Sequence, residues 1–347
     1  MSTREQQLIH WLKQCYSDDI QSLESVSGDA SFRKYYRFKT SSISINATDA
    51  TQNPLCNSAN DVSLIAVDSP PTHENNQAFI DTSLLLKKHS ICVPVIHHYS
   101  PQQGFFVLSD FGDDLLLQQL SSQNADRYYC AAIDSLINLQ AVPTKHLPKY
   151  SAEKLQQEML LFTEWFLQRH HQLQWHESIQ ACLDNTYQLL IDNALAQPQT
   201  FVHRDFHSRN LMILQNQQIG IIDYQDAVCG PITYDLVSLL RDCYIDWPQN
   251  KIDRWISHFH KQIHLSHSIE LDQFKHWFDL MGLQRHLKAV GIFCRLNYRD
   301  NKATYLNDIP RTLNYMLQVS ACYPSLKEFH DFLKSLPSQV LSQASTQ

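Results

Sequence analysis

Three polar side chains with a fixed spacing, Asp205, Asn210 and Asp223, form the group in this sequence that can do chemistry. Asp205 and Asn210 lie in the segment His-Arg-Asp-Phe-His-Ser-Arg-Asn, and Asp223 ends the apolar stretch Ile-Ile-Asp. Asp205 can accept a hydroxyl proton, while the amide five residues later and the second carboxylate supply oxygen ligands for magnesium. Phosphoryl transfer depends mainly on placing the acceptor and neutralising charge. The spacing therefore predicts the catalytic loop and metal-binding carboxylate of a kinase.

Short strands have to position these residues. The pattern predicts a strand at residues 200–202 before the loop, and strands at 210–214 and 218–223 joined by a polar turn. A β-hairpin with charged ends is the alternative, but it gives no reason for so many polar residues to gather at one end of the strands. We expect His203, His207 and Asp235 to support the loop, with the Asp235 carboxylate accepting backbone N–H groups.

The rest of the chain changes character near residue 112. Before it, the pattern predicts a helix at 4–16, strands at 23–27, 32–38, 62–67 and 105–108, and a helix at 74–89. After it, helices are predicted at 126–140, 152–170, 177–194, 234–243, 251–262, 271–297 and 309–317. We predict an α+β protein with a sheet-containing lobe at 1–112, a mostly helical lobe at 113–336 and a frayed polar tail at 337–347.

Composition narrows the classes of partner. The 347 residues are 43% hydrophobic and 18% charged, with a formal charge of −7, which is typical of a globular chain without a basic face for nucleic acid or anionic membranes. The nine cysteines have no Cys-x-x-Cys spacing, so neither a disulfide framework nor a zinc site is indicated. No signal segment or membrane-spanning run is visible. We expect a cytoplasmic protein, with a monomer favoured.

The segment His203-x-Asp205-x-His207-x-x-Asn210 resembles the catalytic loop of the aminoglycoside phosphotransferase and choline kinase-like superfamily. Residues 202–212, 223–240 and 281–295 look closer still to the anomeric N-acetylmuramate/N-acetylglucosamine kinases of bacterial peptidoglycan recycling. The resemblance spans about residues 28–315. It implies a protein-kinase-like two-lobed fold, ATP and Mg²⁺ as cofactors, and an amino sugar whose anomeric hydroxyl becomes a 1-phosphate.

A turn rich in small residues precedes the second predicted strand, where such kinases cover the nucleotide phosphates. By spacing, Gly28, Ala30 and Ser31 belong to that turn, and strand alternation puts Arg33, Tyr35 and Arg37 on one face toward the nucleotide. The backbone around Leu108, Asp110 and Phe111 is expected to face the adenine edge.

The third strand departs from the protein-kinase pattern, because Asp68 stands where a phosphate-binding lysine is expected. Either the chain binds nucleotide without transferring phosphate, or Arg33 and Arg37 supply the missing charge and Asp68 pairs with one of them. The second interpretation agrees better with the intact catalytic loop. Glu74 is a candidate partner for the phosphate-binding cation, or a carboxylate favoured at a helix start. The stretch 40–61 is expected to be a surface insertion.

The acceptor has to reach Asp205, so its contacts should come from the helical lobe. A sugar ring can stack on an aromatic side chain, and a lactyl carboxylate can meet an arginine. The candidate substrate residues are Glu158, Glu164, Trp165, Arg169, Gln225, Asp226, Arg285 and His286. Each is also compatible with an ordinary helix surface or packing role.

Three alternatives remain open at this point. An aminoglycoside phosphotransferase would favour an acidic acceptor pocket, whereas the segment Arg-His-Leu-Lys at 285–288 favours an anionic or neutral sugar. An ATP-binding module without turnover is the non-enzymatic alternative. A protein kinase is disfavoured, because no Ala-Pro-Glu segment follows Asp223.

Overall fold

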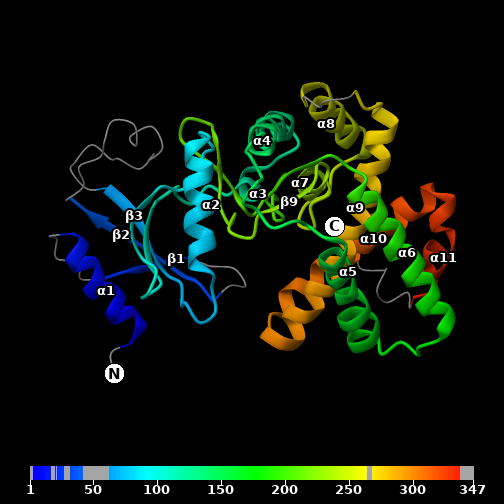
Figure 1. Cartoon of the computed structure of the whole chain (residues 1–347), viewed down its shortest axis with the longest axis horizontal. Coiled ribbons are helices and arrows are strands. Elements are labelled where there is room, and N and C mark those ends of the chain that lie inside the picture. Colours follow the sequence, from blue (N-terminus) through cyan, green and yellow to red (C-terminus); the bar gives the residue numbers. More distant parts are fainter. Residues whose placement is uncertain are drawn as a thin grey trace. The chain divides into compact units, whose positions relative to one another are not determined.

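The computed structural model describes residues 3–16, 20, 22–26, 32–41, 62–263 and 268–336. The chain folds as two compact units (Figure 1): Met1–Asn124 with Arg209–Asp226, and Ala125–Ser208 with Ala227–Gln347. The segment after the catalytic loop thus groups with the first unit. The lobe boundary at residue 112 stays a prediction, and the tail at 337–347 lies outside the described residues.

A five-stranded antiparallel sheet lies at the centre of the first unit (Figure 1). Its strands, in spatial order, are β1 (Glu24–Val26), β2 (Lys34–Thr40), β3 (Val62–Asp68), β5 (Phe105–Ser109) and β4 (Ile96–Ser100). β4 is absent from the sequence prediction, since its two histidines interrupt the apolar pattern that marks a strand.

Strand alternation gives this sheet two apolar faces, and a helix covers each. Helix α1 (Arg4–Cys15) packs on the face that carries Phe38 and Leu64. Helix α2 (Asn76–Lys88) packs on the opposite face, where Val67 and Phe106 lie. The two helices therefore fix the sheet from both sides.

A second small sheet completes the first unit and carries the segment after the catalytic loop. Strands β7 (Leu211–Ile213) and β8 (Ile219–Ile221) pair antiparallel. The unit also contains the short helix α3 (Leu116–Gln119). Phe111 packs against Met212 and Leu214. A Cβ on Gly220 would lie 2.7 Å from the Phe111 ring, so only glycine lets the ring approach this strand.

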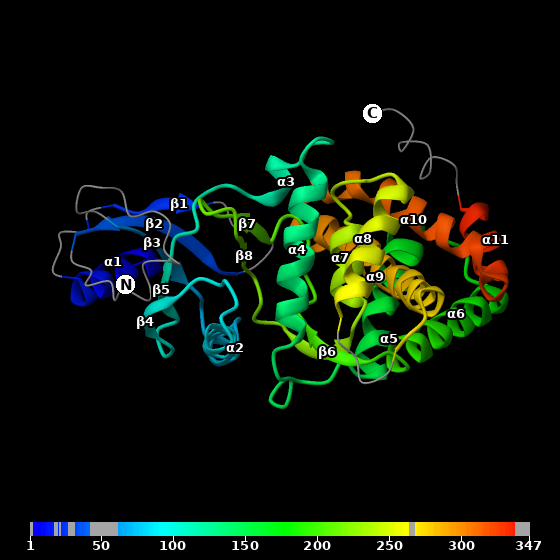
Figure 2. The ribbon, with the colours of Figure 1, turned by 90° about the horizontal axis from the view of Figure 1, so that it is seen from above.

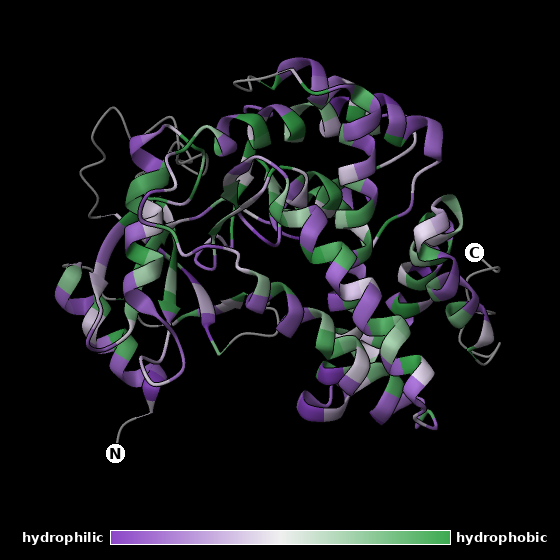
Figure 3. Ribbon diagram, turned by 45° about the vertical axis from the view of Figure 1, so that its right-hand side comes forward, coloured by the Kyte–Doolittle hydropathy of each residue, from purple (hydrophilic) through white to green (hydrophobic). Residues whose placement is uncertain are grey.

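The second unit is mostly helical (Figure 2). Among the described residues, helix α9 (Leu271–Asp300) packs against five α-helices and two further helical segments of the unit, which buries residues around its whole circumference. The other helices are α4 (Ala125–Gln140), α5 (Ala152–Leu161), α6 (Glu177–Leu195), α7 (Tyr234–Leu240), α8 (Gln249–Gln262), α10 (Ile309–Cys322) and α11 (Lys327–Ser335), with the short 3₁₀ segments η2 (Ala303–Asp308) and η3 (Pro324–Leu326). Polar and apolar residues alternate along these helices (Figure 3), as expected where one face is buried.

The single helix predicted at 152–170 is divided into α5 and a π-helical segment, η1 (Phe162–His170). Both pack on α9. Near their junction Gly291 of α9 contacts the backbone of Leu161, where a Cβ would lie 2.3 Å from the carbonyl carbon. Hydrophobic periodicity does not separate a π-helix from an α-helix over nine residues, so the sequence could not predict this widening.

Strands β6 (Gln199–Val202) and β9 (Val228–Pro231) pair antiparallel in the second unit, and the catalytic loop follows β6. The predicted α+β class is confirmed by the antiparallel sheet of the first unit and the helices of the second. Among the described residues, no helix has the length and apolarity needed to cross a membrane.

Candidate active site

Asp235 holds the start of the catalytic loop in the second unit. Its carboxylate accepts the backbone N–H of His203 at 2.7 Å and that of Arg204 at 3.0 Å, and it is fully buried in α7. Burial raises the pKa of Asp235 to about 7, against the effect of the two N–H donors. These are the contacts that the predicted supporting role requires. They hold Arg204 at a φ of 79°, a strained conformation of the kind often found at functional loops.

A buried ionic network fixes the Arg204 side chain. Its guanidinium lies 2.5 Å from Glu158 of α5, and Glu158 also accepts a hydrogen bond from the Tyr150 hydroxyl. Lys288 of α9 lies 3.5 Å from the same carboxylate and donates to the Tyr234 hydroxyl at 3.0 Å. Glu158 is thus engaged within the protein. Its contacts favour support of the loop over the substrate contact that the sequence predicts.

Asp205 lies among positive charges within this unit. Burial alone would raise its pKa, because it disfavours a charged carboxyl group. The electrostatic effects of nearby groups outweigh burial and lower the pKa of Asp205 to about 2; in order of effect the groups are Lys288, His207, Arg204 and Arg285. Asp205 is therefore ionised at neutral pH, as an acceptor for a hydroxyl proton has to be.

The two predicted supporting histidines lie in the loop interior. His203 is fully buried, and its Nδ1 accepts the backbone N–H of Asp205 at 3.3 Å. His207 is buried edge-on against the ring of Tyr244, with centroids 5.3 Å apart. Asp242 holds the end of the loop, where it accepts the backbone N–H of Ser208 at 2.9 Å and its hydroxyl at 2.5 Å.

In the first unit, Asn210 and Asp223 converge. The Asn210 amide lies 3.4 Å from the Asp223 carboxylate, and Asp223 is held at a φ of 66°. Magnesium usually takes one or two protein carboxylates together with substrate phosphates and waters, so an amide oxygen and a carboxylate fit it. Among the described residues, no group of three or more His, Cys, Asp or Glu side chains could hold a metal ion.

Two predicted substrate residues lie beside this carboxylate. Gln225 donates to Asp223 at 2.8 Å and lies 3.4 Å from Asp226, which is exposed. Both belong to the first unit. Their placement favours an influence on Asp223 over recognition of a sugar.

The residue after Asp223 anchors it to helix α2. The Tyr224 ring stacks on Phe79 with centroids 5.5 Å apart, and its hydroxyl lies 2.8 Å from that of Ser83. Tyr224 is buried. The position of the Asp223 carboxylate is thus coupled to the packing of α2.

The nucleotide residues predicted on β2 and just before it have different partners. Arg33 is 7% exposed and lies 3.0 Å from Glu74, which precedes α2. Burial raises the pKa of the neighbouring Tyr35 to about 12. Gly28, Ala30 and Ser31 lie outside the described residues, as do residues 42–61 of the predicted insertion.

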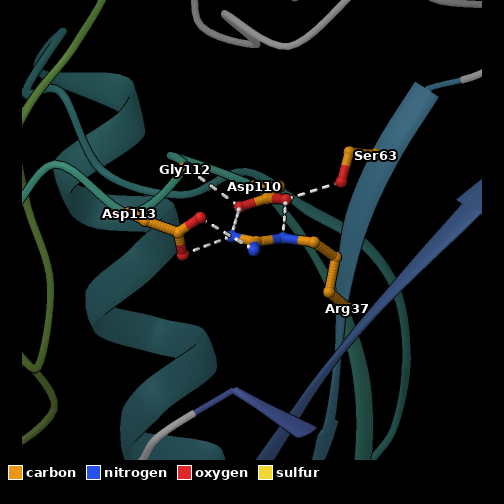
Figure 4. A network of polar contacts seen from close by, with 5 residues as sticks. All are labelled: Arg37, Ser63, Asp110, Gly112 and Asp113. Atoms are coloured by element: carbon orange, nitrogen blue, oxygen red, sulfur yellow. Dashed lines mark hydrogen bonds and ion pairs between the residues drawn. The ribbon is translucent and has the colours of Figure 1, made fainter. Parts of the chain in front are cut away.

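Arg37 is enclosed by carboxylates (Figure 4). Its guanidinium donates to Asp110 at 2.6 and 3.1 Å and to Asp113 at 2.9 and 3.0 Å. Ser63 and the Gly112 N–H also donate to Asp110, whose pKa is lowered although burial opposes the shift. The Asp110 side chain is therefore used in the fold, as are the buried side chains of Leu108 and Phe111, which belong to two of the apolar clusters of this unit.

The prediction that Asp68 pairs with Arg33 or Arg37 is wrong. Its carboxylate is bound by Arg4 of α1, through Nε at 3.0 Å and through Nη2. Arg4 also donates to the Gln103 carbonyl oxygen at 2.8 Å. Arg33 and Arg37 already have nearer carboxylates, so the N-terminal helix supplies the counter-charge.

The remaining predicted substrate residues occupy helices of the second unit. His286 is fully buried, donates from Nε2 to the Arg241 carbonyl at 3.0 Å, and stacks on Tyr315; burial lowers its pKa to about 3. This placement favours packing over substrate contact. Arg285 is buried near Cys243, and its charge contributes to the lowered pKa of Asp205.

Glu164, Trp165 and Arg169 lie on the π-helical segment. Glu164 and Arg169 are exposed and Trp165 is partly exposed. The Arg169 guanidinium lies 5.2 Å from the Trp165 ring and 5.2 Å from the Tyr298 ring. Arg169, Trp165 and Tyr298 thus form one surface group. The role of Glu164, Trp165 and Arg169 in substrate binding stays a prediction.

From the sequence, Lys288 enters only through the charge of the segment 285–288, and neither Asp242 nor Arg4 is named as a partner of the predicted site residues. Lys288 follows Arg285 by three residues on α9, a spacing that puts both on one helix face and could have marked it. Asp242 follows Asp235 by seven residues. No local signal relates Arg4 to Asp68, because the two are 64 residues apart.

Comparisons with known proteins identify the family and the fold of the chain. The model of the phosphotransferase enzyme family matches residues 22–262. Two relatives named N-acetylmuramate/N-acetylglucosamine kinase, from Pseudomonas putida and Neisseria meningitidis, are 35% and 34% identical, each over 96% of both chains. The fold is similar to that of the choline kinase LicA from Streptococcus pneumoniae, with a TM-score of 0.61, 12% identity, and 92% of this chain and 100% of that chain covered. This likeness confirms the predicted kinase-like fold, and the chain belongs to the phosphotransferase enzyme family.

Proposed function

We propose that this enzyme uses ATP and Mg²⁺ to phosphorylate the anomeric hydroxyl of N-acetylmuramate or N-acetylglucosamine, giving the 1-phosphate. The observation that carries the proposal is the ionised Asp205 in a loop fixed by Asp235 and Asp242, in a chain 35% identical to a relative named for these two sugars. We expect the reaction to take place in the cytoplasm, where ATP is available.

Asp205 has the properties of an orienting acceptor. A carboxylate with a pKa of about 2 is a weak base, so it draws little proton from a free alcohol. In a loose phosphoryl-transfer transition state the proton leaves late, which makes orientation of the hydroxyl its main contribution. The anomeric hydroxyl is more acidic than an ordinary alcohol, and it therefore suits this base.

Asn210 and Asp223 would hold magnesium through their amide and carboxylate oxygens. Magnesium, when bound, neutralises the charge of the transferred phosphoryl group. Gln225 orients the Asp223 carboxylate by donating to it at 2.8 Å, and Tyr224 holds its backbone on α2.

The charges around Asp205 bear on the acceptor. Lys288, Arg204 and Arg285 all stabilise its negative charge, so this part of the second unit carries several cationic groups. The carboxylates of Asp205, Glu158 and Asp242 belong to the same group and offset these three positive charges, so charge alone does not separate an aminoglycoside from a neutral sugar. The preference for an N-acetyl sugar rests on the relatives named for N-acetylmuramate and N-acetylglucosamine.

The test is ADP formation from ATP and Mg²⁺ with N-acetylmuramate, N-acetylglucosamine, glucose and kanamycin. We expect turnover with the two N-acetyl sugars only, and a fall of about 100- to 10,000-fold in kcat for Asp205→Asn. Turnover with kanamycin would move the acceptor class to aminoglycosides. ATP binding without turnover on any acceptor would contradict a catalytic role.

A further inference from the structure

The residue at the usual phosphate-binding position of β3 cannot bind phosphate in this chain. Kinases place a lysine there and hold it with a glutamate of the following helix. Here the position is Asp68, which is 3% exposed and bound by Arg4. A buried anion would repel the nucleotide phosphates, so another cation has to take the role of the lysine.

Arg33 lies next to this position, just before the start of β2. The register pairs Lys34 of β2 with Asp68 of β3, so Arg33 lies one residue beyond the pair. Its guanidinium lies 3.0 Å from Glu74, donates to the Ser69 hydroxyl at 3.3 Å and lies 5.6 Å from the Phe79 ring. Glu74 comes just before α2. In kinases the glutamate that pairs with the lysine lies in the corresponding helix, so Glu74 has a similar place.

The same group of residues leads to the metal-binding carboxylate. Burial raises the pKa of the Tyr35 hydroxyl, and the charges of both Arg33 and Asp223 act on the same group. Phe79, beneath Arg33, stacks on Tyr224, the residue after Asp223. The guanidinium of Arg33 is therefore positioned by the same packing as Asp223.

Arg37, the other candidate cation, is less suited. Two carboxylates, Asp110 and Asp113, each receive two hydrogen bonds from its guanidinium (Figure 4). The group of three carries a net negative charge, whereas the Arg33–Glu74 pair is neutral, as the lysine–glutamate pair of kinases is. Phosphate binding at Arg37 would have to displace a carboxylate.

We propose that Arg33 binds the α- and β-phosphates of ATP in place of the β3 lysine, and that Glu74 positions its guanidinium. This rests on the proposed function only in taking ATP as the phosphoryl donor. The chain has thus moved the phosphate-binding cation from the third strand to the segment before the second strand. Arg4 neutralises the aspartate that stands in the vacated position.

Calorimetric titration of the full chain with Mg-ATP, Mg-ADP and adenosine tests this proposal. A charge-assisted hydrogen bond corresponds to about 10- to 100-fold in affinity, so Arg33→Gln should weaken ATP and ADP by that factor and leave adenosine unchanged. Arg33→Lys should recover part of the loss. Glu74→Gln should weaken ATP binding less than Arg33→Gln does, again without an effect on adenosine.

Lys34→Gln is the matched control. Lys34 is the next residue after Arg33 and its side chain is exposed, so the variant removes one positive charge of the same size. It should leave all three affinities unchanged. Equal weakening of ATP and adenosine by Arg33→Gln, or unchanged ATP binding, would overturn the assignment. Failure of the wild-type protein to phosphorylate N-acetyl sugars would refute the proposed acceptor but would not affect this binding result.

Discussion

Replacing Arg4 by methionine should destabilise the protein more than replacing Asp68 by asparagine. The Asp68 side chain is 4% exposed, whereas that of Arg4 is 40% exposed. Without Arg4, a buried carboxylate loses its counter-charge and cannot reach water. Without the charge of Asp68, the guanidinium of Arg4 can turn into solvent. The two substitutions remove the same ion pair, yet their costs should differ.

The contacts of Arg4 set the magnitude. Arg4→Met loses the two hydrogen bonds to Asp68, the 2.8 Å bond to the Gln103 carbonyl and a guanidinium 4.7 Å from the Phe105 ring. Breaking a buried pair costs about 3–5 kcal/mol, which we reduce to about 2–3 kcal/mol because Arg4 is partly exposed. Asp68→Asn keeps an acceptor oxygen, so its cost should be about 1 kcal/mol.

Urea unfolding at pH 7 measures both values, and the double variant Arg4→Met/Asp68→Asn serves as the control. Because the double variant buries no unpaired charge, it should be more stable than Arg4→Met alone by about 1–2 kcal/mol. The reasoning is refuted if Asp68→Asn costs as much as Arg4→Met, or if the two losses simply add.

Two further predictions concern the second unit. Because the pKa of Asp205 is lowered to about 2, its ionised form stabilises the fold above the unfolded value near 4, and that contribution is lost as the pH falls toward 2. Relative to Asp205→Asn, the wild type should lose about 2 kcal/mol between pH 5 and pH 2 in urea unfolding; a constant difference would contradict the assigned charge environment. Gly291→Ala should cost about 1–3 kcal/mol in thermal or urea unfolding, because its Cβ would lie 2.3 Å from the Leu161 backbone. In the matched variant Gly282→Ala the nearest atom is the end of the Arg241 side chain at 3.3 Å, so its cost should be smaller, and equal losses would argue against the backbone clash.

The sequence was sufficient for those parts of the site that are local in the chain. Asp205 and Asn210 are five residues apart, and the short strands around them follow from their apolar residues, so spacing alone predicted the loop. Asp235 was also recognisable, because a buried acid at the start of a helix close to the loop has backbone donors within reach.

Partners that are distant in the chain could not be predicted. Arg4 and Asp68 are joined only because α1 packs on the face of the sheet opposite to α2, and that packing depends on the whole apolar face of the sheet. Glu158 was predicted to contact the substrate, but Arg204, Lys288 and Tyr150 enclose it in the structure. Polarity gives no sign of such burial when the counter-charges come from other helices.

The central claim is that Asp205 orients the anomeric hydroxyl for phosphorylation. The most direct measurement follows the reducing end of N-acetylmuramate during turnover, because only phosphate on the anomeric oxygen removes it. The account predicts that one reducing end disappears for each ADP formed, and that neither change occurs in Asp205→Asn. ADP formation with the reducing end retained would place the phosphate on another hydroxyl and would contradict the account.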